Sequence, residues 1–407
     1  MKKTVSLILV LLMLCGAAFG LPQLSPTGAS AQDARDVLRV HEDGSFRILQ
    51  IADLQDYYCP KEGSLGEVNI YFRELNTILL AIARVQPDLI VLTGDNISGP
   101  SCRTKWLSEK AICQVMDVFE RLGVPVAMVF GNHDDENTPL DKLAQIEMYE
   151  RYSCFIGCSG VVAERTVGGE STLNAGTYNI PVYESADSDK VAYNVWCIDS
   201  GNYNPDPAYG GYGYVLPEQI DWYVKTSDAL KEANGGKPVP SIAFQHIIPP
   251  HIYRALKSVQ GGTPGSVGSG NQAFMLPDGT NPEINWLSEP PCPPSTACEA
   301  AYAEIDTMLR QGDVKAVFVG HDHINNYIVP YEGIDLVCSQ GCTFHSYNDH
   351  HRGFRVITID KDSTDTYDTY MLSSDTLLRE GSRFDAALYS LRILYDKAAA
   401  FFRNLFS

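Results

Sequence analysis

Between residues 46 and 130, short apolar runs alternate with longer stretches whose apolar residues recur every three to four positions. The runs Phe46–Ala52, Leu89–Thr93 and Val124–Phe130 have the length and composition of buried strands. The stretches Asn69–Val85 and Lys105–Leu122 have the periodicity of helices. This order of elements predicts a parallel sheet with right-handed crossovers.

The chain then continues with further strands and helices and with two long loops. We predict a helix over Thr138–Arg151, with Thr138 as its cap and Pro139 in its first turn. Residues 201–215 and 258–296 are rich in turn-forming residues, which indicates long loops, and we expect the first to cover the site described below. The other expected elements are Thr177–Tyr183, Lys190–Ile198, Pro217–Ala233, Ser241–Phe244, Glu299–Arg310 and Val314–Val319, followed by an antiparallel set at Asn325–Pro330, Ile334–Ser339, Phe354–Asp360 and Thr366–Leu372.

Side chains that commonly bind metals follow directly after five of the apolar runs. They are Asp53, Asp95, Asn132 with His133 and Asp134, His246, and the pair His321 and His323. Because the carboxyl ends of strands in an α/β sheet form the usual binding edge, we expect these side chains to share one site. Oxygen and nitrogen donors without clustered thiolates favour Mn, Fe or Zn over Ca, and a pair of divalent metals is the simplest interpretation.

Length and charge narrow the class of protein. The chain has 407 residues and is 44% hydrophobic, which is enough for one large domain, and we place that domain at residues 40–375. The formal net charge of −19 disfavours nucleic acid as a partner, since phosphate backbones repel an acidic surface. The chain lacks the phosphate-binding loop motif Gly-x-x-x-x-Gly-Lys-Ser/Thr.

The first 31 residues resemble a secretory leader. Lys2 and Lys3 precede an apolar run from Val5 to Leu14 and then small residues, so we expect export with cleavage after Gly20 or after Ala31. Cys15 raises the alternative of a lipoprotein anchor, which the bulky Leu14 before it disfavours. No later stretch is long and apolar enough to span a bilayer.

The C-terminal residues 380–407 are expected to form an amphipathic helix. Its apolar stripe either docks on the domain or contacts a membrane surface or a partner. The cysteines are even in number after the leader, which is typical of disulfides in an exported chain, and Cys197 looks like a buried free thiol. The possible local bridges are Cys102–Cys113, Cys154–Cys158, Cys292–Cys298 and Cys338–Cys342.

The order of the polar clusters resembles that of the calcineurin-like metallophosphoesterases. The matching motifs are Asp53-x-Gln55, Gly94-Asp95, Gly131-Asn132-His133-Asp134, His246 and Gly320-His321-x-His323. The forms Gly94-Asp95-Asn96-Ile97 and Gly320-His321-Asp322-His323 resemble the purple-acid-phosphatase-like branch. Each motif is weak alone, whereas five in order from Phe46 to Leu372 are specific. The resemblance implies a four-layer α/β/β/α sandwich with mixed sheets and the metal site at the carboxyl ends of the strands.

The resemblance also implies a role for each residue. Asp53, Asp95 and His323 would bind one metal, and Asp95 would bridge to a second. The second metal would be bound by Asp95, Asn132, His246 and His321. His133 would face the substrate and protonate the leaving oxygen, while Asp134 or Asp322 orients a neighbouring histidine. His345 lies in a segment that resembles a family loop near the site, where it would contact substrate.

The chemistry implied is hydrolysis of a phosphate ester by a hydroxide that bridges two metals about 3.5–4 Å apart. Gln55 stands where the family has a histidine, so it either binds metal through its carbonyl oxygen, holds a metal-bound water or is a bystander. Ser98 stands where the coloured iron enzymes have a tyrosine, so we do not expect a purple protein. We expect a phosphomonoesterase. The alternatives are a phosphodiesterase and a metal- or phosphate-binding protein with impaired catalysis.

Overall fold

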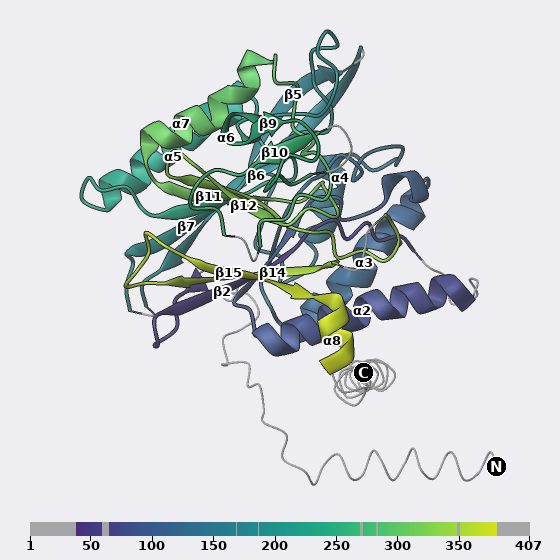
Figure 1. The fold of residues 1–407 in the computed structure, drawn as a ribbon. Helices are drawn as coiled ribbons and strands as arrows, with labels where there is room; N and C mark the ends of the chain where they lie inside the picture. Colours follow the sequence, from purple (N-terminus) through teal and green to yellow (C-terminus); the bar gives the residue numbers. More distant parts are fainter. Residues whose placement is uncertain are drawn as a thin grey trace, which may run out of the picture. The chain divides into compact units, whose positions relative to one another are not determined.

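The computed structural model describes residues 38–58, 65–167, 169–185, 187–268, 272–281, 284–347 and 351–380 (Figure 1). The expected leader, residues 1–31, and nearly all of the expected C-terminal helix lie outside the described residues. Both stay predictions, as do the domain bounds 40–375.

A five-stranded sheet carries the first part of the chain. Its central strands β2 (Ser45–Ile51), β3 (Leu89–Thr93) and β4 (Val126–Val129) are parallel, and β14 (Gly353–Asp360) joins them antiparallel to β2. The strand order is β15-β14-β2-β3-β4, with β15 at Asp368–Ser373. Four helices pack on the outer face, namely α2 (Leu65–Val85), α3 (Lys105–Leu122), α4 (Lys142–Tyr149) and α8 (Ser374–Glu380).

An eight-stranded mixed sheet carries the middle of the chain. Its order is β1-β6-β7-β8-β11-β13-β12, with β5 paired to β6. The strands are β1 (Leu38–Arg39), β5 (Val161–Val167), β6 (Glu170–Tyr183), β7 (Val191–Cys197), β8 (Ser241–Phe244), β11 (Val314–Val319), β12 (Tyr327–Tyr331) and β13 (Ile334–Cys338). On its outer face lie α5 (Pro217–Ala233), α6 (Ile252–Ala255) and α7 (Ala303–Gln311), which follows the 3-10 turn Glu299–Tyr302.

Three apolar cores separate four layers. One core lies between α2, α3 and the five-stranded sheet, a second lies between the two sheets, and a third lies between the eight-stranded sheet and α5 and α7. Phe318 of β11 and Ile48 of β2 both belong to the core between the sheets and are fully buried. The predicted α/β/β/α sandwich with mixed sheets is therefore confirmed (Figure 1).

Three local expectations are wrong. The helix expected from Thr138 begins at Lys142, because the Asp141 side chain caps it by accepting the Ala144 N–H at 2.8 Å. The expected closing antiparallel set is divided: β12 and β13 complete the large sheet, where β13 runs parallel to β11, while β14 and β15 belong to the small one. Strand β5 was not expected; it is the outer strand of a hairpin with β6, and only two of its residues are buried.

The cysteines of the described part of the chain are all free thiols, so the four expected local bridges do not form there. Cys197 is buried in β7 as expected. Among the described residues, no helix combines the length and the apolar character needed to cross a membrane. The long loop 258–296 contains a short two-stranded ladder of β9 (Lys257–Val259) and β10 (Ala273–Met275).

Candidate metal centre

The carboxyl ends of strands from both sheets converge on one cluster of polar side chains. Asp53 follows β2, Asp95 follows β3 and Asn132 follows β4 in the small sheet. His246 follows β8 and His321 follows β11 in the large sheet. Because each of these strand sets is internally parallel, their ends lie at the same edge and the five ligand-bearing turns meet there.

Asp53, Asp95 and His323 form one half of this cluster. Each offers a donor atom within 4.8 Å of the others, and all three side chains are buried. His323 Nε2 lies 3.4 Å from Asp53 Oδ1, and both oxygens of Asp53 accept the His321 N–H, at 3.1 and 3.0 Å. The Gln55 amide nitrogen lies 3.3 Å from both Asp95 Oδ2 and His323 Nε2. Rotation of this amide by half a turn would present its carbonyl oxygen at the same place.

Asp95, Asn132, His246 and His321 form the other half. His246 Nε2 lies 3.4 Å from Asp95 Oδ1 and 3.2 Å from Asn132 Oδ1. His321 Nδ1 in turn lies 3.2 Å from His246 Nε2. The two oxygens of Asp95 therefore face the two halves of the cluster, Oδ1 towards His246 and Oδ2 towards Gln55. This arrangement suits a carboxylate that bridges two cations.

Two glycines make room for the ligands. A Cβ added at Gly131 would lie 2.2 Å from Asp95 Oδ1, and one added at Gly94 would lie 2.5 Å from His246 Nδ1. These distances are shorter than any van der Waals contact, so the Gly-Asp and Gly-Asn motifs follow from close packing of the turns against the ligands.

The backbone of the site is strained as well. Asp53, Gln55, Asp95 and His321 adopt positive φ angles of 50°, 47°, 50° and 71°. Residues other than glycine are sterically strained at positive φ, and strained residues of this kind are concentrated at functional sites.

The histidines are oriented for metal binding. His246 Nδ1 lies 2.9 Å from the Thr93 carbonyl oxygen, and His323 Nδ1 lies 3.0 Å from the Tyr347 carbonyl oxygen. A backbone carbonyl on Nδ1 accepts a ring proton, so Nε2 of each ring is directed into the cluster, where it can bind a metal once its own proton is lost. Buried carboxylates, an amide and imidazoles, without thiolates, form a donor set that fits Mn, Fe or Zn.

Electrostatics within the cluster are strongly coupled. Burial favours the neutral form of His246, but the charge of Asp95 outweighs it and raises the pKa of His246 to about 10. The charge of Asp53 likewise outweighs burial and raises the pKa of His323 to about 9. For His321, burial and the neighbouring His246 lower the pKa well below its ordinary value. Metal binding here would therefore displace protons from His246 and His323.

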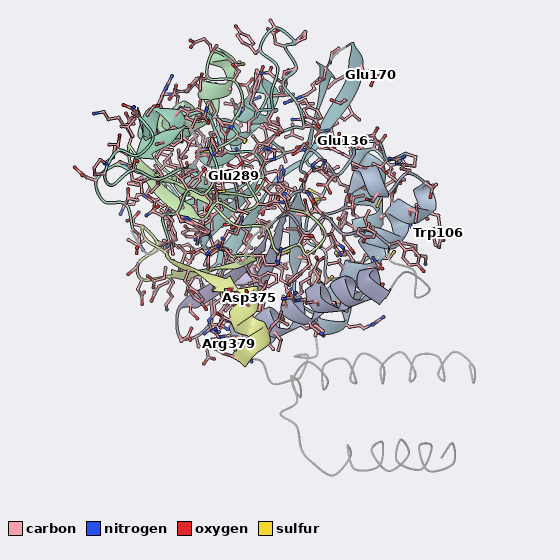
Figure 2. All side chains as sticks on the ribbon, turned by 45° about the vertical axis from the view of Figure 1, so that its right-hand side comes forward. Trp106, Glu136, Glu170, Glu289, Asp375 and Arg379 are labelled. Atoms are coloured by element: carbon pink, nitrogen blue, oxygen red, sulfur yellow. The ribbon has the colours of Figure 1, made fainter. Side chains whose placement is uncertain are left out.

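His133 is the most accessible histidine of the set. Its side chain is 36% exposed, and its Nε2 lies 4.0 Å from Asp95 Oδ2. The backbone N–H of His133 donates to Asp95 Oδ1 at 2.8 Å. On the other side of the ring, Nδ1 lies 2.5 Å from Glu136 Oε2 (Glu136 is labelled in Figure 2). The ring thus faces the cluster with Nε2 and is held by a carboxylate at Nδ1.

Asp134 has a different role from the one expected. The backbone N–H groups of Asn96, Ile97 and Gly131 donate to its buried carboxylate at 2.8, 3.0 and 2.7 Å. It therefore ties the turn after β3 to the turn after β4 rather than orienting a histidine. Asp322 likewise accepts the Cys292 N–H at 3.2 Å, which ties loop 258–296 to the turn that carries His321 and His323.

His345 does not lie where a substrate contact was expected. Its side chain is 3% exposed and its Nε2 lies 3.8 Å from the buried Glu74 Oε2. Its ring packs edge-on against Tyr57 at 4.5 Å. The structure thus places His345 in a separate buried group, and the expected substrate contact is not supported.

The expected loop over the site is present. The Tyr212 ring packs edge-on against His321 with 4.1 Å between ring centroids, and the Tyr203 hydroxyl lies 3.3 Å from Glu136 Oε1. On the opposite side, the exposed Tyr347 ring stacks on His323 at 4.3 Å.

Sequence reasoning missed two of these residues. Glu136 lies three residues after His133, which was a usable signal, because the two then share one turn of the loop. No sequence pattern identified Tyr347, because its contact with His323 depends on the path of the chain after β13.

Comparison with known proteins agrees with this geometry. The family model of the calcineurin-like phosphoesterases matches residues 46–325. A relative named probable inactive purple acid phosphatase 29, from Arabidopsis thaliana, is 29% identical over 83% of this chain and 82% of its own length. Phosphatase DCR2 from Saccharomyces cerevisiae is 26% identical over 71% of this chain and 46% of its own length. A dimetal phosphatase from Danio rerio, at 13% identity, covers 81% of this chain and 99% of its own with a TM-score of 0.44.

The family match spans more than half of the chain and includes each predicted ligand from Asp53 to His323. The purple-acid-phosphatase names among the relatives agree with the branch that the Gly94-Asp95-Asn96-Ile97 and Gly320-His321-Asp322-His323 motifs indicated. This chain therefore belongs to the calcineurin-like phosphoesterase family.

Proposed function

We propose that this protein is an exported phosphoesterase with a dinuclear metal centre, and that it hydrolyses phosphate monoesters. The observation that carries the proposal is the position of Asp95, whose Oδ1 lies 3.4 Å from His246 and whose Oδ2 lies 3.3 Å from Gln55. A buried carboxylate shared between two ligand groups is what a two-metal site requires. When bound, the two cations supply positive charge to the phosphoryl oxygens and lower the pKa of a water.

The chain's own residues supply proton transfer and positioning. His133 Nε2 faces the cluster from its accessible side, where it is placed to donate a proton to the leaving oxygen of an ester. Glu136 holds the ring by its Nδ1, which keeps a proton on that nitrogen and fixes the direction of Nε2. The backbone N–H of His133 donates to Asp95 Oδ1, and Gly131 lets the turn approach that carboxylate closely, so the acid and the metal ligands keep a constant spacing.

We propose monoesters as the substrates because the names of two relatives contain the word phosphatase. The loops 201–215 and 258–296 bound the site, and specificity towards the alcohol part of the ester would depend on them. Tyr203 and Tyr212 offer stacked rings there, with 6.2 Å between centroids. A phosphodiesterase is the alternative within the same family.

A protein that binds metal or phosphate without turnover is the alternative outside enzymes. It is favoured by Gln55 in place of a histidine and by the names of three relatives, which are called probable inactive purple acid phosphatases. An amide binds a cation more weakly than an imidazole, which would lower metal occupancy in the half of the cluster formed by Asp53, Asp95 and His323.

Two measurements distinguish the monoesterase, the diesterase and the non-catalytic protein. They are the turnover of p-nitrophenyl phosphate and bis-p-nitrophenyl phosphate, and the metal content of the protein. We expect turnover of the monoester that is lost on chelation and returns with Mn²⁺ or Zn²⁺, and that is lost in Asp95→Ala and His321→Ala. The exposed Glu218→Gln on α5 is the matched control. Full activity of Asp95→Ala would refute the proposal. Two bound metals without turnover, followed by activity in Gln55→His, would support the impaired protein instead.

Export is proposed from the apolar leader after Lys2 and Lys3. The net charge of −19 supports the absence of nucleic acid partners. The apolar stripe within residues 380–407 supports docking on the domain or contact with a membrane surface or a partner. N-terminal sequencing of protein from the culture medium and sedimentation with anionic vesicles, before and after truncation at residue 380, test these two points.

A further inference from the structure

A second buried group of metal-type side chains lies beside the first. Asp56, Glu74 and His345 each offer a donor atom, and these atoms lie within 4.8 Å of one another. In the described parts of the chain, this geometry recurs only at Asp53, Asp95 and His323, which are expected metal ligands on independent grounds. The family motifs do not include Asp56, Glu74 or His345.

The two groups share the backbone segment after β2 but have different surroundings. Gln55 and Asp56 are consecutive there, and Gln55 adopts a positive φ of 47°, so the backbone turns between the two side chains. Gln55 faces Asp95, whereas Asp56 faces Gln114 on α3, whose amide donates to Asp56 Oδ2 at 3.1 Å. The backbone of Asp56 is fixed by hydrogen bonds with Asn96 and Ser98, at 3.1 and 2.8 Å.

The carboxylates of this group are poorly compensated. Asp56 is 1% exposed and Glu74 3% exposed. The Phe344 N–H donates to Glu74 Oε2 at 2.8 Å, and the charge of Arg352 also acts on Glu74. Asp56 Oδ1, by contrast, is buried and accepts no hydrogen bond from any described residue. Burying an ionised oxygen without a partner costs far more free energy than burying a neutral polar group, unless a cation or a proton is nearby.

Asp56 and Glu74 are both buried, so two carboxylate charges would lie close together away from water if both groups were ionised. Two solutions remove the cost. The carboxyls keep protons, or a divalent cation neutralises both charges at once. The imidazole of His345 beside Glu74 favours the cation, because it adds a nitrogen donor to two oxygens.

We propose that Asp56, Glu74 and His345 bind a structural divalent cation of the Mn, Fe or Zn type, separate from the catalytic centre. This cation joins α2, the end of β2 and the segment after β13. That segment continues to Tyr347, whose carbonyl oxygen orients His323 at 3.0 Å. The cation therefore stabilises the backbone that supports His323, and it lies against α2, which carries Glu74, and α3, which carries Gln114.

The test is the zinc content of the whole chain, stripped with chelator and reloaded with Zn²⁺ alone, together with anomalous diffraction at the zinc edge. We expect Glu74→Gln to lose one zinc per chain relative to the unmodified protein while keeping its catalytic zinc. Glu218→Gln on α5, an exposed position, should lose none. The anomalous map of the unmodified protein should show a peak between Asp56, Glu74 and His345.

No peak at this position, or equal zinc content in Glu74→Gln, would overturn the inference in favour of protonated carboxyls. The map decides the matter even if Glu74→Gln fails to fold, because it uses the unmodified chain. Failure of the proposed function has a different signature, namely no peak between Asp53, Asp95 and His323. The two results are thus independent.

Discussion

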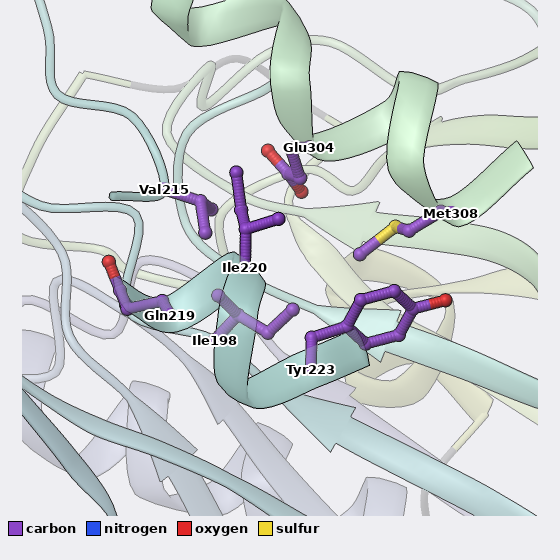
Figure 3. A pocket seen from close by; sticks show the side chains of 7 residues that line it. All are labelled: Ile198, Val215, Gln219, Ile220, Tyr223, Glu304 and Met308. Atoms are coloured by element: carbon purple, nitrogen blue, oxygen red, sulfur yellow. The ribbon is translucent and has the colours of Figure 1, made fainter. Parts of the chain in front are cut away.

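Replacement of Glu304 by glutamine should make the protein more stable at alkaline pH. Glu304 lies on α7 and extends into a small cavity of about 10 Å³, which Ile220, Val215 and Met308 help to line (Figure 3). Gln245 donates an amide N–H to Glu304 Oε2 at 3.5 Å, and Oε1 has no hydrogen-bond partner in the described part of the chain. Burial therefore raises the pKa of Glu304 from 4.5 to about 8.

The sign and size of the effect follow from proton linkage. Between pH 4.5 and about 8 the folded protein keeps a proton on Glu304 that the unfolded chain has lost, so the free energy of unfolding falls as the pH rises. At about 1.4 kcal/mol for each unit of pKa, the loss is about 1 kcal/mol at pH 5.5 and about 4 kcal/mol at pH 8. Glutamine has nearly the same shape and carries no charge, so Glu304→Gln avoids this loss.

Urea unfolding followed by tryptophan fluorescence, at intervals from pH 5.5 to 8, measures the difference between the variant and the unmodified protein. We expect the difference to grow steadily in favour of glutamine. Glu299→Gln, at an exposed carboxylate on the preceding turn, should give a small difference that does not change with pH. A constant difference for Glu304→Gln would show that burial does not hold the proton, and the reasoning would be wrong.

Three further outcomes are expected. Gly131→Ala should abolish binding of both catalytic metals, measured by elemental analysis, because its Cβ would lie 2.2 Å from Asp95 Oδ1; normal metal content would contradict the close packing described here. Glu136→Gln should slow phenyl phosphate about 10- to 100-fold and p-nitrophenyl phosphate much less, since a good leaving group needs little help from the acid His133; equal slowing of both would argue against this role. Phe318→Ala should cost about 3–5 kcal/mol in urea unfolding, because the ring is fully buried between Phe244 and Tyr367, and a cost below about 1 kcal/mol would mean that the core between the sheets collapses around the gap.

The sequence by itself determined most of the elements and the identity of the metal-type residues. The runs Leu89–Thr93 and Val314–Val319 are found as strands with the expected bounds, because strands buried on both faces are almost entirely apolar; Lys315 is the one charged residue in them and is partly exposed. The helices Lys105–Leu122 and Pro217–Ala233 are also found as expected, because apolar residues recur every three to four positions in a helix that buries one face. Polar residues directly after buried strands stand out because nothing in the core requires them there.

The tertiary structure alone decided which of these residues act together. Asp134 and His133 are neighbours in sequence, yet one binds backbone amides and the other faces Asp95. Nor could local sequence assign β12 and β13 to the large sheet, because strand pairing depends on long-range packing rather than on propensity.

His345 illustrates the same limit. Its sequence neighbourhood resembled a loop near the active site, whereas its contacts are with Tyr57 and Glu74, which lie far away in the sequence. Gln55 and Asp56 are consecutive, yet Gln55 lies in the catalytic cluster and Asp56 contacts Gln114 on α3, because the backbone turns at Gln55 with a positive φ. Sequence therefore names the donors, and the fold decides which of them share a site.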